Sequence, residues 1–329
     1  MDRKINGRIT GLGSYAPARR LTNSDLEKMV NTSDEWIFSR SGIRERRICG
    51  SDETNSDMAV AAARKALDMA RLRPEDIELI LVGTVTPDYR LPSNACIMQK
   101  KMGMFNAAAI DIAAACAAFI NGLSIANAFI KSGQYKRVLV VGVEKLSSIT
   151  DYTDRSTCVL FGDGAGAVVL EACDDDRGVL STFLKSDGRY AELLWIPHGG
   201  SMNPVLAPDS DRRSVYLKMN GSEVFKHAVK MMGDASLKAL AGAGLTGDDV
   251  TLMVPHQANI RIIEATAKRL RVPMERVFLN IAMYGNTSSA SVPMAMDAAL
   301  RAGRIKDGDI ILMAAFGGGL TWAAAVVRW

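Results

Sequence analysis

Short apolar segments that alternate with helical segments are the feature that most constrains the fold of this chain. Residues 79–83, 109–112 and 137–143 read as strands buried on both faces of a sheet. Helical segments lie between them, so we expect βαβ units and a mostly parallel sheet. Ser56 is expected to cap a helix that runs to about residue 71, and capping boxes at 24–27 and 32–35 are expected to open two short helices.

The second half of the chain repeats this order. Strands are predicted at 252–254, 277–280 and 310–315, and helices at 260–270 and 292–302. Each half also closes with a strand, a glycine turn and a second apolar strand. We therefore predict an internal duplication, with one domain at 1–174, another at 175–329, a join in the acidic segment 174–177 and a shared site where the halves meet. Residues 186–220 are rich in Pro, Gly, Ser and Asp, and are expected to form a long surface excursion.

Composition excludes several classes of protein. A net charge of +4 on 329 residues is too mild for a nucleic-acid-binding surface. The five cysteines are scattered, without the spacing of a zinc site or a disulfide framework, so we expect no metal. The polar start of the chain and these cysteines favour a reducing cytoplasm. No apolar run reaches the roughly 20 residues of a spanning helix, so we expect no membrane segment.

Cys116 is the cysteine with the most reactive setting. It follows a predicted strand and precedes an alanine-rich helix, so it is expected at or near a helix N-terminus. The helix dipole and free N–H groups there favour the nucleophilic thiolate. The alternative is a small buried hydrophobic residue, which is the commoner role of a cysteine and explains the other four better.

Polar residues of the second half are candidates for the same site. His256 follows a buried strand, at the sheet edge where open α/β folds build their sites. Asn286 follows Gly285 and serves either as a helix cap or as a hydrogen-bond donor beside Cys116 and His256. The glycines 317–319 form either a tight hairpin or an oxyanion hole of bare N–H groups.

Taken in order, these motifs resemble the β-ketoacyl-acyl carrier protein synthase III family, a condensing branch of the thiolase superfamily. The resemblance covers nearly the whole chain and is highly specific as a set. It rests on N-T-S-D-E-W-I, S-G-I-R-E-R-R, the Cys116 segment, F-G-D-G-A-G-A, P-H-Q-A-N, Y-G-N-T-S-S-A-S-V-P and F-G-G-G-L-T-W. It implies an α/β fold, the thiolase-like duplicated αβαβα five-layer sandwich, assembled as a homodimer.

The resemblance also implies a role for individual residues. The family's catalytic triad maps onto Cys116, His256 and Asn286, and its oxyanion hole onto the backbone N–H groups of Cys116 and Gly318. The coenzyme A tunnel maps onto Trp36, Arg40, Arg155, Phe225 and Asn259. Lys226 and Arg261 would lie near the tunnel mouth, where the carrier protein docks.

The implied reaction starts fatty acid synthesis. An acyl group from acyl-coenzyme A is held on the cysteine and condensed with malonyl-acyl carrier protein, with loss of carbon dioxide and without a metal or redox cofactor. A specialised condensing enzyme of the quinolone or polyketide type is the alternative within the superfamily. A cysteine hydrolase is a further alternative, because Cys-His-Asn also serves proteases.

Three positions depart from the family pattern. Ala113 stands where the family commonly has Asn, and Ala118 where it commonly has Gly, so we expect these changes to affect substrate preference more than the chemistry. Leu91 stands where an aromatic residue often precedes the proline and reaches across the dimer to the partner's acyl pocket. Because leucine is shorter, we expect that this enzyme accepts acetyl and also somewhat longer primers.

Overall fold

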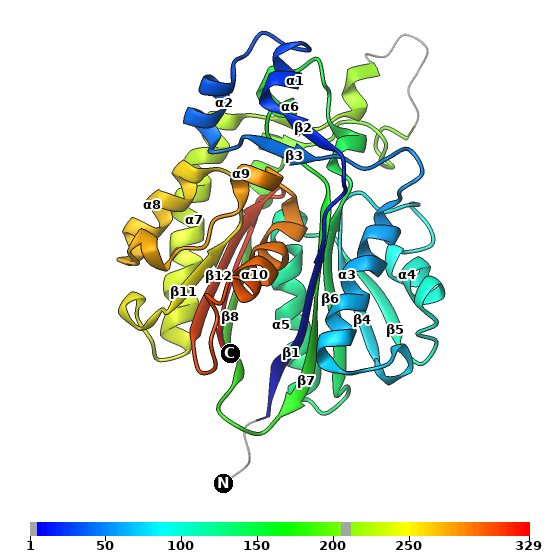
Figure 1. Cartoon of the computed structure of the whole chain (residues 1–329), viewed down its shortest axis with the longest axis vertical. Coiled ribbons are helices and arrows are strands. Elements are labelled where there is room, and N and C mark those ends of the chain that lie inside the picture. The colour runs from blue at the N-terminus through cyan, green and yellow to red at the C-terminus, as the bar shows by residue number, and fades with distance from the viewer. Residues whose placement is uncertain (1–4, 205–211) are drawn as a thin grey trace.

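Two mixed β-sheets form the framework of the computed structural model, which describes residues 5–204 and 212–329 (Figure 1). The first sheet has the order β1-β7-β6-β4-β5, and the second has the order β11-β12-β13-β8. The strands of the first sheet are β1 (Asn6–Tyr15), β4 (Leu79–Gly83), β5 (Ala108–Ile112), β6 (Arg137–Glu144) and β7 (Gly164–Cys173). Those of the second are β8 (Gly178–Ser186), β11 (Leu252–Pro255), β12 (Ile310–Gly317) and β13 (Thr321–Arg328).

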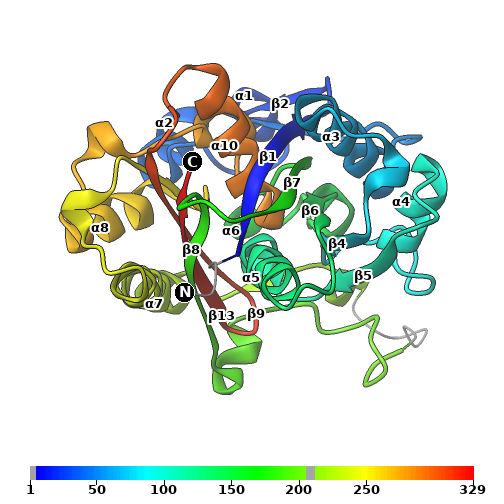
Figure 2. The same cartoon turned by 90° about the horizontal axis from the view of Figure 1, so that it is seen from below.

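Helices cover both faces of each sheet and complete five layers, as the view from below shows (Figure 2). Helices α3 and α4 cover the outer face of the first sheet, α7 and α8 cover that of the second, and α5 and α10 lie between the sheets. Their bounds are α3 (Asn55–Ala70), α4 (Asn94–Met102), α5 (Ala118–Lys131), α7 (Gly221–Gly242), α8 (Ile260–Leu270) and α10 (Ser291–Arg301). The expected αβαβα sandwich is therefore confirmed.

Smaller elements gather at one end of the sheets (Figure 1). They are β2 (Arg20–Thr22), α1 (Asn23–Glu27), α2 (Asp34–Ser41), β3 (Glu45–Arg47), α6 (Arg155–Cys158), β9 (Leu194–Trp195), β10 (Lys218–Met219) and α9 (Ile281–Tyr284). Strands β9 and β10 belong to the predicted excursion 186–220, of which residues 205–211 lie outside the described residues. None of the described helices is long and apolar enough to cross a membrane.

The duplication is visible in the strand pairing. In the first sheet β4 runs parallel to β6, which is followed by the antiparallel neighbours β7 and β1. In the second sheet β11 runs parallel to β12, which is followed by the antiparallel neighbours β13 and β8. The first sheet ends at Cys173 and the second begins at Gly178, so the acidic segment 174–177 links the two.

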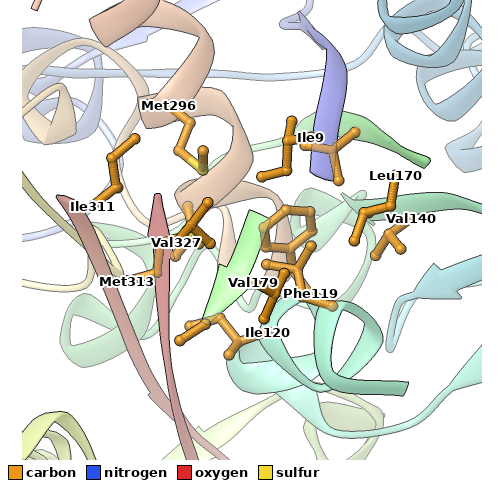
Figure 3. Close-up of a cluster of buried hydrophobic side chains, with 14 of the residues drawn as sticks. Ile9, Phe119, Ile120, Val140, Leu170, Val179, Met296, Ile311, Met313 and Val327 are labelled. Carbon is orange, nitrogen blue, oxygen red and sulfur yellow. The ribbon is translucent and has the colours of Figure 1, made fainter. Parts of the chain in front are cut away.

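One apolar core holds the two sheets together. Figure 3 shows Phe119 and Ile120 of α5 and Met296 of α10 among side chains of both sheets. Ile9 and Leu170 reach this cluster from the first sheet. Ile311, Met313 and Val327 reach it from the second sheet. Burial of such side chains contributes about 1.5–3 kcal/mol each, so the central layer is a large part of the stability.

The expectation of a mostly parallel sheet is wrong, because both sheets are mixed. Parallel neighbours need a crossover of a dozen or more residues, usually a helix. The turn between β12 and β13 is far too short for one, and these strands pair antiparallel. The strand expected at 277–280 is reduced to a single bridge between Met253 and Val277. The strand at β5 lies at a sheet edge and is half-exposed rather than buried on both faces.

The three predicted helix starts are each off by one or two residues. Thr54, not Ser56, caps α3, and its side chain accepts a hydrogen bond from the N–H of Asp57. Thr22 caps α1 and Ser33 caps α2. The Ser56 hydroxyl instead contacts the Asp88 carboxylate and the ammonium of Lys101. Local sequence therefore located the helices but not which hydroxyl caps them.

Candidate active site

Cys116 lies in a short 3₁₀ helix, η2 (Ala115–Ala117), between the end of β5 and the start of α5. Ala115 has a φ of 43°, an unfavourable value for a residue with a side chain, directly before the cysteine. Gly317 closes over the turn. A Cβ added there would lie 2.6 Å from the backbone nitrogen of Cys116, so a side chain is excluded. The cysteine is thus held at a strained turn beneath the end of β12.

The Cys116 thiol is strongly biased toward its neutral form. Burial raises its pKa to about 12, a hydrogen bond from Ser288 lowers it, and the charge of Glu144 raises it further. Burial and the Glu144 charge therefore oppose the thiolate, whereas the hydrogen bond from Ser288 favours it. The expectation that the helix start favours the thiolate stays a prediction.

His256 follows β11, as expected, and is buried. Its backbone N–H donates to the carbonyl of Ala314 on β12 at 2.7 Å, which ties the residue to the sheet. Its ring Nδ1 lies 2.6 Å from the hydroxyl oxygen of Ser291. Burial lowers the pKa of the imidazole to about 3, so the ring is neutral at physiological pH.

Asn286 lies in the loop between α9 and a second 3₁₀ helix, η8 (Ser288–Ala290). Its backbone donates to Leu160 at 2.8 Å and accepts from Gly162 at 3.0 Å, which joins this loop to the first half. The side-chain oxygen accepts from the N–H of Ser288 at 2.8 Å. The amide nitrogen is therefore the end that remains for a ligand.

These residues line one cavity of about 400 Å³ between the two halves. Cys116 comes from the first half, whereas His256, Asn286 and Gly318 come from the second. Most of the wall is apolar, which strengthens the effect of the few polar groups that face it. The apolar part of the wall includes Val85, Leu146, Ile149, Leu160, Phe161, Leu194, Leu217, Met219, Val224, Met232, Ile262 and Phe316.

The residues expected along a coenzyme A tunnel fall into two groups. Phe225 and Asn259 line the cavity. Trp36, Arg40 and Arg155 do not, but Asn259 donates to the backbone carbonyl of Arg40 at 2.9 Å and so connects the two groups. The Arg155 guanidinium stacks on the Trp36 ring, 4.8 Å from its centroid.

The two expected docking cations flank the cavity. The Arg261 guanidinium lies 5.6 Å from the centroid of the Phe225 ring. Lys226 is exposed and forms an ion pair of 2.7 Å with Glu223. Lys226 lies on α7 and Arg261 on α8, and each is next to a residue of the cavity wall.

Leu91 does not line the cavity of its own chain. Its side chain is 87% exposed, so the predicted role at the end of a partner's pocket stays a prediction. Ala118 is buried with its methyl toward Gly83, where an added Cβ would lie 2.7 Å away. Its extra methyl group therefore fills space beside β4 and is not part of the cavity wall.

Two groups at the site were missed by sequence reasoning. Glu144 is fully buried at the end of β6 and accepts hydrogen bonds from Thr86 at 2.7 Å and from Ser288 and Ser289 at 3.1 Å each. Burial raises the pKa of its carboxyl to about 7. A charged residue closing an apolar strand was the available signal for Glu144. Ser291 had no comparable signal, since it resembles any serine near a helix start.

Comparison with known proteins places these motifs in a family. The model of 3-oxoacyl-[acyl-carrier-protein] synthase III matches residues 110–188, and the model of its C-terminal part matches residues 240–329. A beta-ketoacyl-[acyl-carrier-protein] synthase III from Caldanaerobacter subterraneus is 50% identical over 329 residues, covering 100% of this chain and 99% of the relative.

Solved structures agree with this result. The 3-oxoacyl-[acyl-carrier-protein] synthase III of Aquifex aeolicus has a TM-score of 0.91 at 48% identity, covering 98% of this chain and 100% of that one. The priming β-ketosynthase of the R1128 polyketide pathway has a TM-score of 0.92 at 37% identity, covering 100% of this chain and 97% of that one.

Proposed function

This chain belongs to the 3-oxoacyl-[acyl-carrier-protein] synthase III family, and we propose that it starts type II fatty acid synthesis. It condenses a short acyl group from acyl-coenzyme A with malonyl-acyl carrier protein, through an acyl thioester on Cys116. The observation that carries this proposal is the convergence of Cys116, His256, Asn286 and Gly318 on one largely apolar cavity. A metal or redox cofactor has no part in it.

The first half-reaction loads the cysteine. The Cys116 sulfur attacks the thioester carbonyl carbon, and a new C–S bond forms as the bond to the coenzyme A sulfur breaks. The thiol proton leaves Cys116 and ends on the coenzyme A thiolate. The backbone N–H groups of Cys116 and Gly318 are suited to stabilise the transient oxyanion, since Gly317 brings the two segments into contact.

The second half-reaction forms the carbon–carbon bond. The malonyl thioester loses carbon dioxide, and the electron pair of the broken bond makes an enolate. His256 Nδ1 is occupied by Ser291 and the Asn286 side-chain oxygen by Ser288, so Nε2 and the amide nitrogen are left to donate to the enolate oxygen. The enolate carbon then attacks the acyl carbon, and the Cys116 sulfur leaves.

Substrate access is proposed from the residues around the cavity. Coenzyme A would follow Phe225, Asn259 and Arg40 toward Trp36 and Arg155. Since Arg155 already contacts Trp36, adenine can bind between them only if the arginine swings away. Lys226 and Arg261 would guide the acidic carrier protein to the mouth, because rim charges act mainly on the association rate.

A homodimer is proposed from the edge of the first sheet. Strand β5 lies at the outer edge of the molecule, and no strand of the described residues pairs with it on that side (Figure 1). Ile110 on this strand, Phe105 before it and Leu91 nearby in the chain are exposed apolar side chains. An exposed apolar edge is suited to pairing with a second copy. The five cysteines are unpaired, which supports a cytoplasmic location.

The alternatives are less well supported. A specialised condensing enzyme would share the triad. However, the relative named beta-ketoacyl-[acyl-carrier-protein] synthase III is 50% identical to this chain, whereas the polyketide priming enzyme is 37% identical. A cysteine hydrolase needs water at the acyl-cysteine, whereas this cavity is mostly apolar.

The test is to incubate the protein with acetyl-coenzyme A and malonyl-carrier protein and to follow both proteins by intact mass. Cys116 should gain one acyl group, and the carrier protein should then gain the condensed product. Cys116→Ser should show neither change. Release of free acid without condensed product would contradict the proposal, as would a label that persists in Cys116→Ser.

A further inference from the structure

The state of the His256 ring decides what this residue can do. A neutral imidazole carries its hydrogen on one nitrogen only, and the partner of the other nitrogen selects which one. Only the form with hydrogen on Nε2 can donate a hydrogen bond into the cavity. The contact of Nδ1 with Ser291, at 2.6 Å, is therefore the contact that controls the ring.

The direction of this hydrogen bond follows from the other partners of Ser291. The backbone N–H of Gln257 points at the same hydroxyl oxygen from 3.4 Å and can only donate. Among the described residues, no acceptor other than Nδ1 is found for the hydroxyl hydrogen of Ser291. A buried hydroxyl without an acceptor is unfavourable, so the hydroxyl donates and Nδ1 accepts.

The surroundings hold this arrangement in place. The Gln257 side chain is buried and donates to the carbonyls of Pro255 at 2.8 Å and Phe278 at 3.2 Å. It also accepts a hydrogen bond from the N–H of Asn280 at 3.0 Å. These three bonds hold Gln257 in place, and with it the backbone N–H that points at Ser291. Ser291 is the first residue of α10, yet the cap position is Ala290 and no side chain caps this helix. The serine hydroxyl is thus directed to the histidine and not to the helix.

We propose that Ser291 is a positioning residue that holds His256 in the tautomer with hydrogen on Nε2. The tautomer follows from the contacts alone. Its consequence for catalysis rests on the proposed function, in which Nε2–H donates to the enolate oxygen. Loss of the hydroxyl leaves Nδ1 free to take the hydrogen, and the fraction of the ring that can donate into the cavity falls.

The experiment is nitrogen NMR on protein labelled with ¹⁵N-histidine. The chain has three histidines, His198, His227 and His256, so the ring signals are few, and His256→Gln identifies the one of interest. In the unmodified protein at pH 7.5, His256 should show an unprotonated Nδ1 and a protonated Nε2. Ser291→Ala should shift both signals toward a mixture of tautomers, and Ser291→Thr, which keeps the hydroxyl, should restore them.

The matched control is Ser289→Ala. Ser289 is a buried serine of the neighbouring turn, but its hydroxyl bonds to the Gly83 carbonyl and to Glu144, so the His256 signals should not move. In the same proteins, Ser291→Ala should slow malonyl-carrier protein decarboxylation roughly 10–100-fold, the range seen when the orienting partner of a functional histidine is removed. Self-acylation of Cys116 and the KM for the carrier protein should change little.

A protonated Nδ1 in the unmodified protein would overturn the proposal without any variant. Unchanged His256 signals in Ser291→Ala would overturn it as well. A protein with the expected tautomer that condenses no malonyl-carrier protein would support the assignment of Ser291 and contradict the proposed function.

Discussion

At the scale of single residues, burial shifts the pKa values of the ionisable groups in and around the site. The same cause raises the pKa of Cys116 to about 12, raises that of Glu144 to about 7 and lowers that of His256 to about 3. Desolvation penalises whichever form is charged, so acids and bases move in opposite directions. A neutral imidazole suits a hydrogen-bond donor to an enolate.

The buried His256 should make the protein sensitive to acid. Its pKa is about 3 in the folded state, against about 6.5 when unfolded. Between these values the unfolded state binds a proton that the folded state does not, so stability falls as the pH falls. We expect His256→Gln to reduce this slope by up to about 1.4 kcal/mol per pH unit.

The measurement is urea unfolding of both proteins from pH 3.5 to 7.5. Equal slopes in the His256→Gln variant and the unmodified protein would contradict the buried neutral ring.

Glu144 should act with the opposite sign. Its folded pKa is about 7, above the value near 4.5 of an unperturbed carboxyl. The folded state therefore binds the extra proton, and stability falls as the pH rises from 4.5 to 7, by about 3 kcal/mol in all. Glu144→Gln cannot titrate, so its stability should lack this decline. The same unfolding series checks it, and the prediction fails if the difference between the two proteins is constant with pH.

At the scale of elements, the sequence predicted those helices and strands whose bounds are set by the local pattern of apolar and polar residues. The expected bounds 79–83 and 260–270 are those of β4 and α8. The strand expected at 277–280 failed for a reason outside its own residues. The N–H of Asn280 is taken by the side chain of Gln257, so it is not available to a sheet. A short stretch of sequence does not show which of its backbone N–H groups will bond to side chains from elsewhere in the chain.

Helix α8 should decide how well the carrier protein is used. Arg261 lies beside Phe225 at the cavity wall, so Arg261→Glu places a negative charge where an acidic partner would approach. We expect malonyl-carrier protein kcat/KM to fall about tenfold or more at low salt, with less effect as salt rises. Self-acylation by acyl-coenzyme A should change much less.

The control is Arg64→Glu, the same charge change at an exposed position of α3 on the other outer layer (Figure 1). Steady-state kinetics of both half-reactions at two salt concentrations will separate the cases. Equal loss in both half-reactions for Arg261→Glu would indicate a blocked tunnel instead of a docking site.

At the scale of the whole molecule, the site depends on residues that are distant in the chain. The resemblance to the family located Cys116, His256 and Asn286, and the structure brings all three to one cavity. Without that resemblance, the sequence around each of these residues was also compatible with a purely structural role. The resemblance did not locate Ser291 or Glu144. The role of Ser291 comes from its contacts with His256 and Gln257, which are distant in sequence but in the same half. Glu144 bonds across the halves to Ser288 and Ser289.

The proposed dimer should depend on the edge of the first sheet. Ile110 on β5 is 44% exposed, and Ile110→Lys places a charge on this edge, a common means of blocking strand pairing. We expect the variant to be monomeric by light scattering after gel filtration. Leu184→Lys is the control, since Leu184 is a strand residue of similar exposure, 39%, on β8 in the other sheet. A dimeric Ile110→Lys protein would place the interface elsewhere.

Primer length should depend on the same assembly. If Leu91 reaches the partner's acyl pocket, Leu91→Phe makes that pocket shallower and shifts preference toward acetyl. Each methylene that is no longer buried costs about 0.8 kcal/mol, or roughly fourfold in kcat/KM. The measurement is kcat/KM over a series of straight-chain acyl-coenzyme A donors. An unchanged profile would show that Leu91 acts in another way. So would the same shift when Leu91→Phe is introduced into the monomeric Ile110→Lys protein.

The central layer has a consequence for how the protein is made. Phe119, in α5, shares its core with Met313 of β12 and Val327 of β13, which are synthesised much later than α5. The first sheet can pair its strands early, but one face of it stays uncovered until β12 and β13 have been synthesised. Because β13 lies between β12 and β8 in the second sheet, loss of β13 would also leave this face of the first sheet exposed to proteases and chaperones.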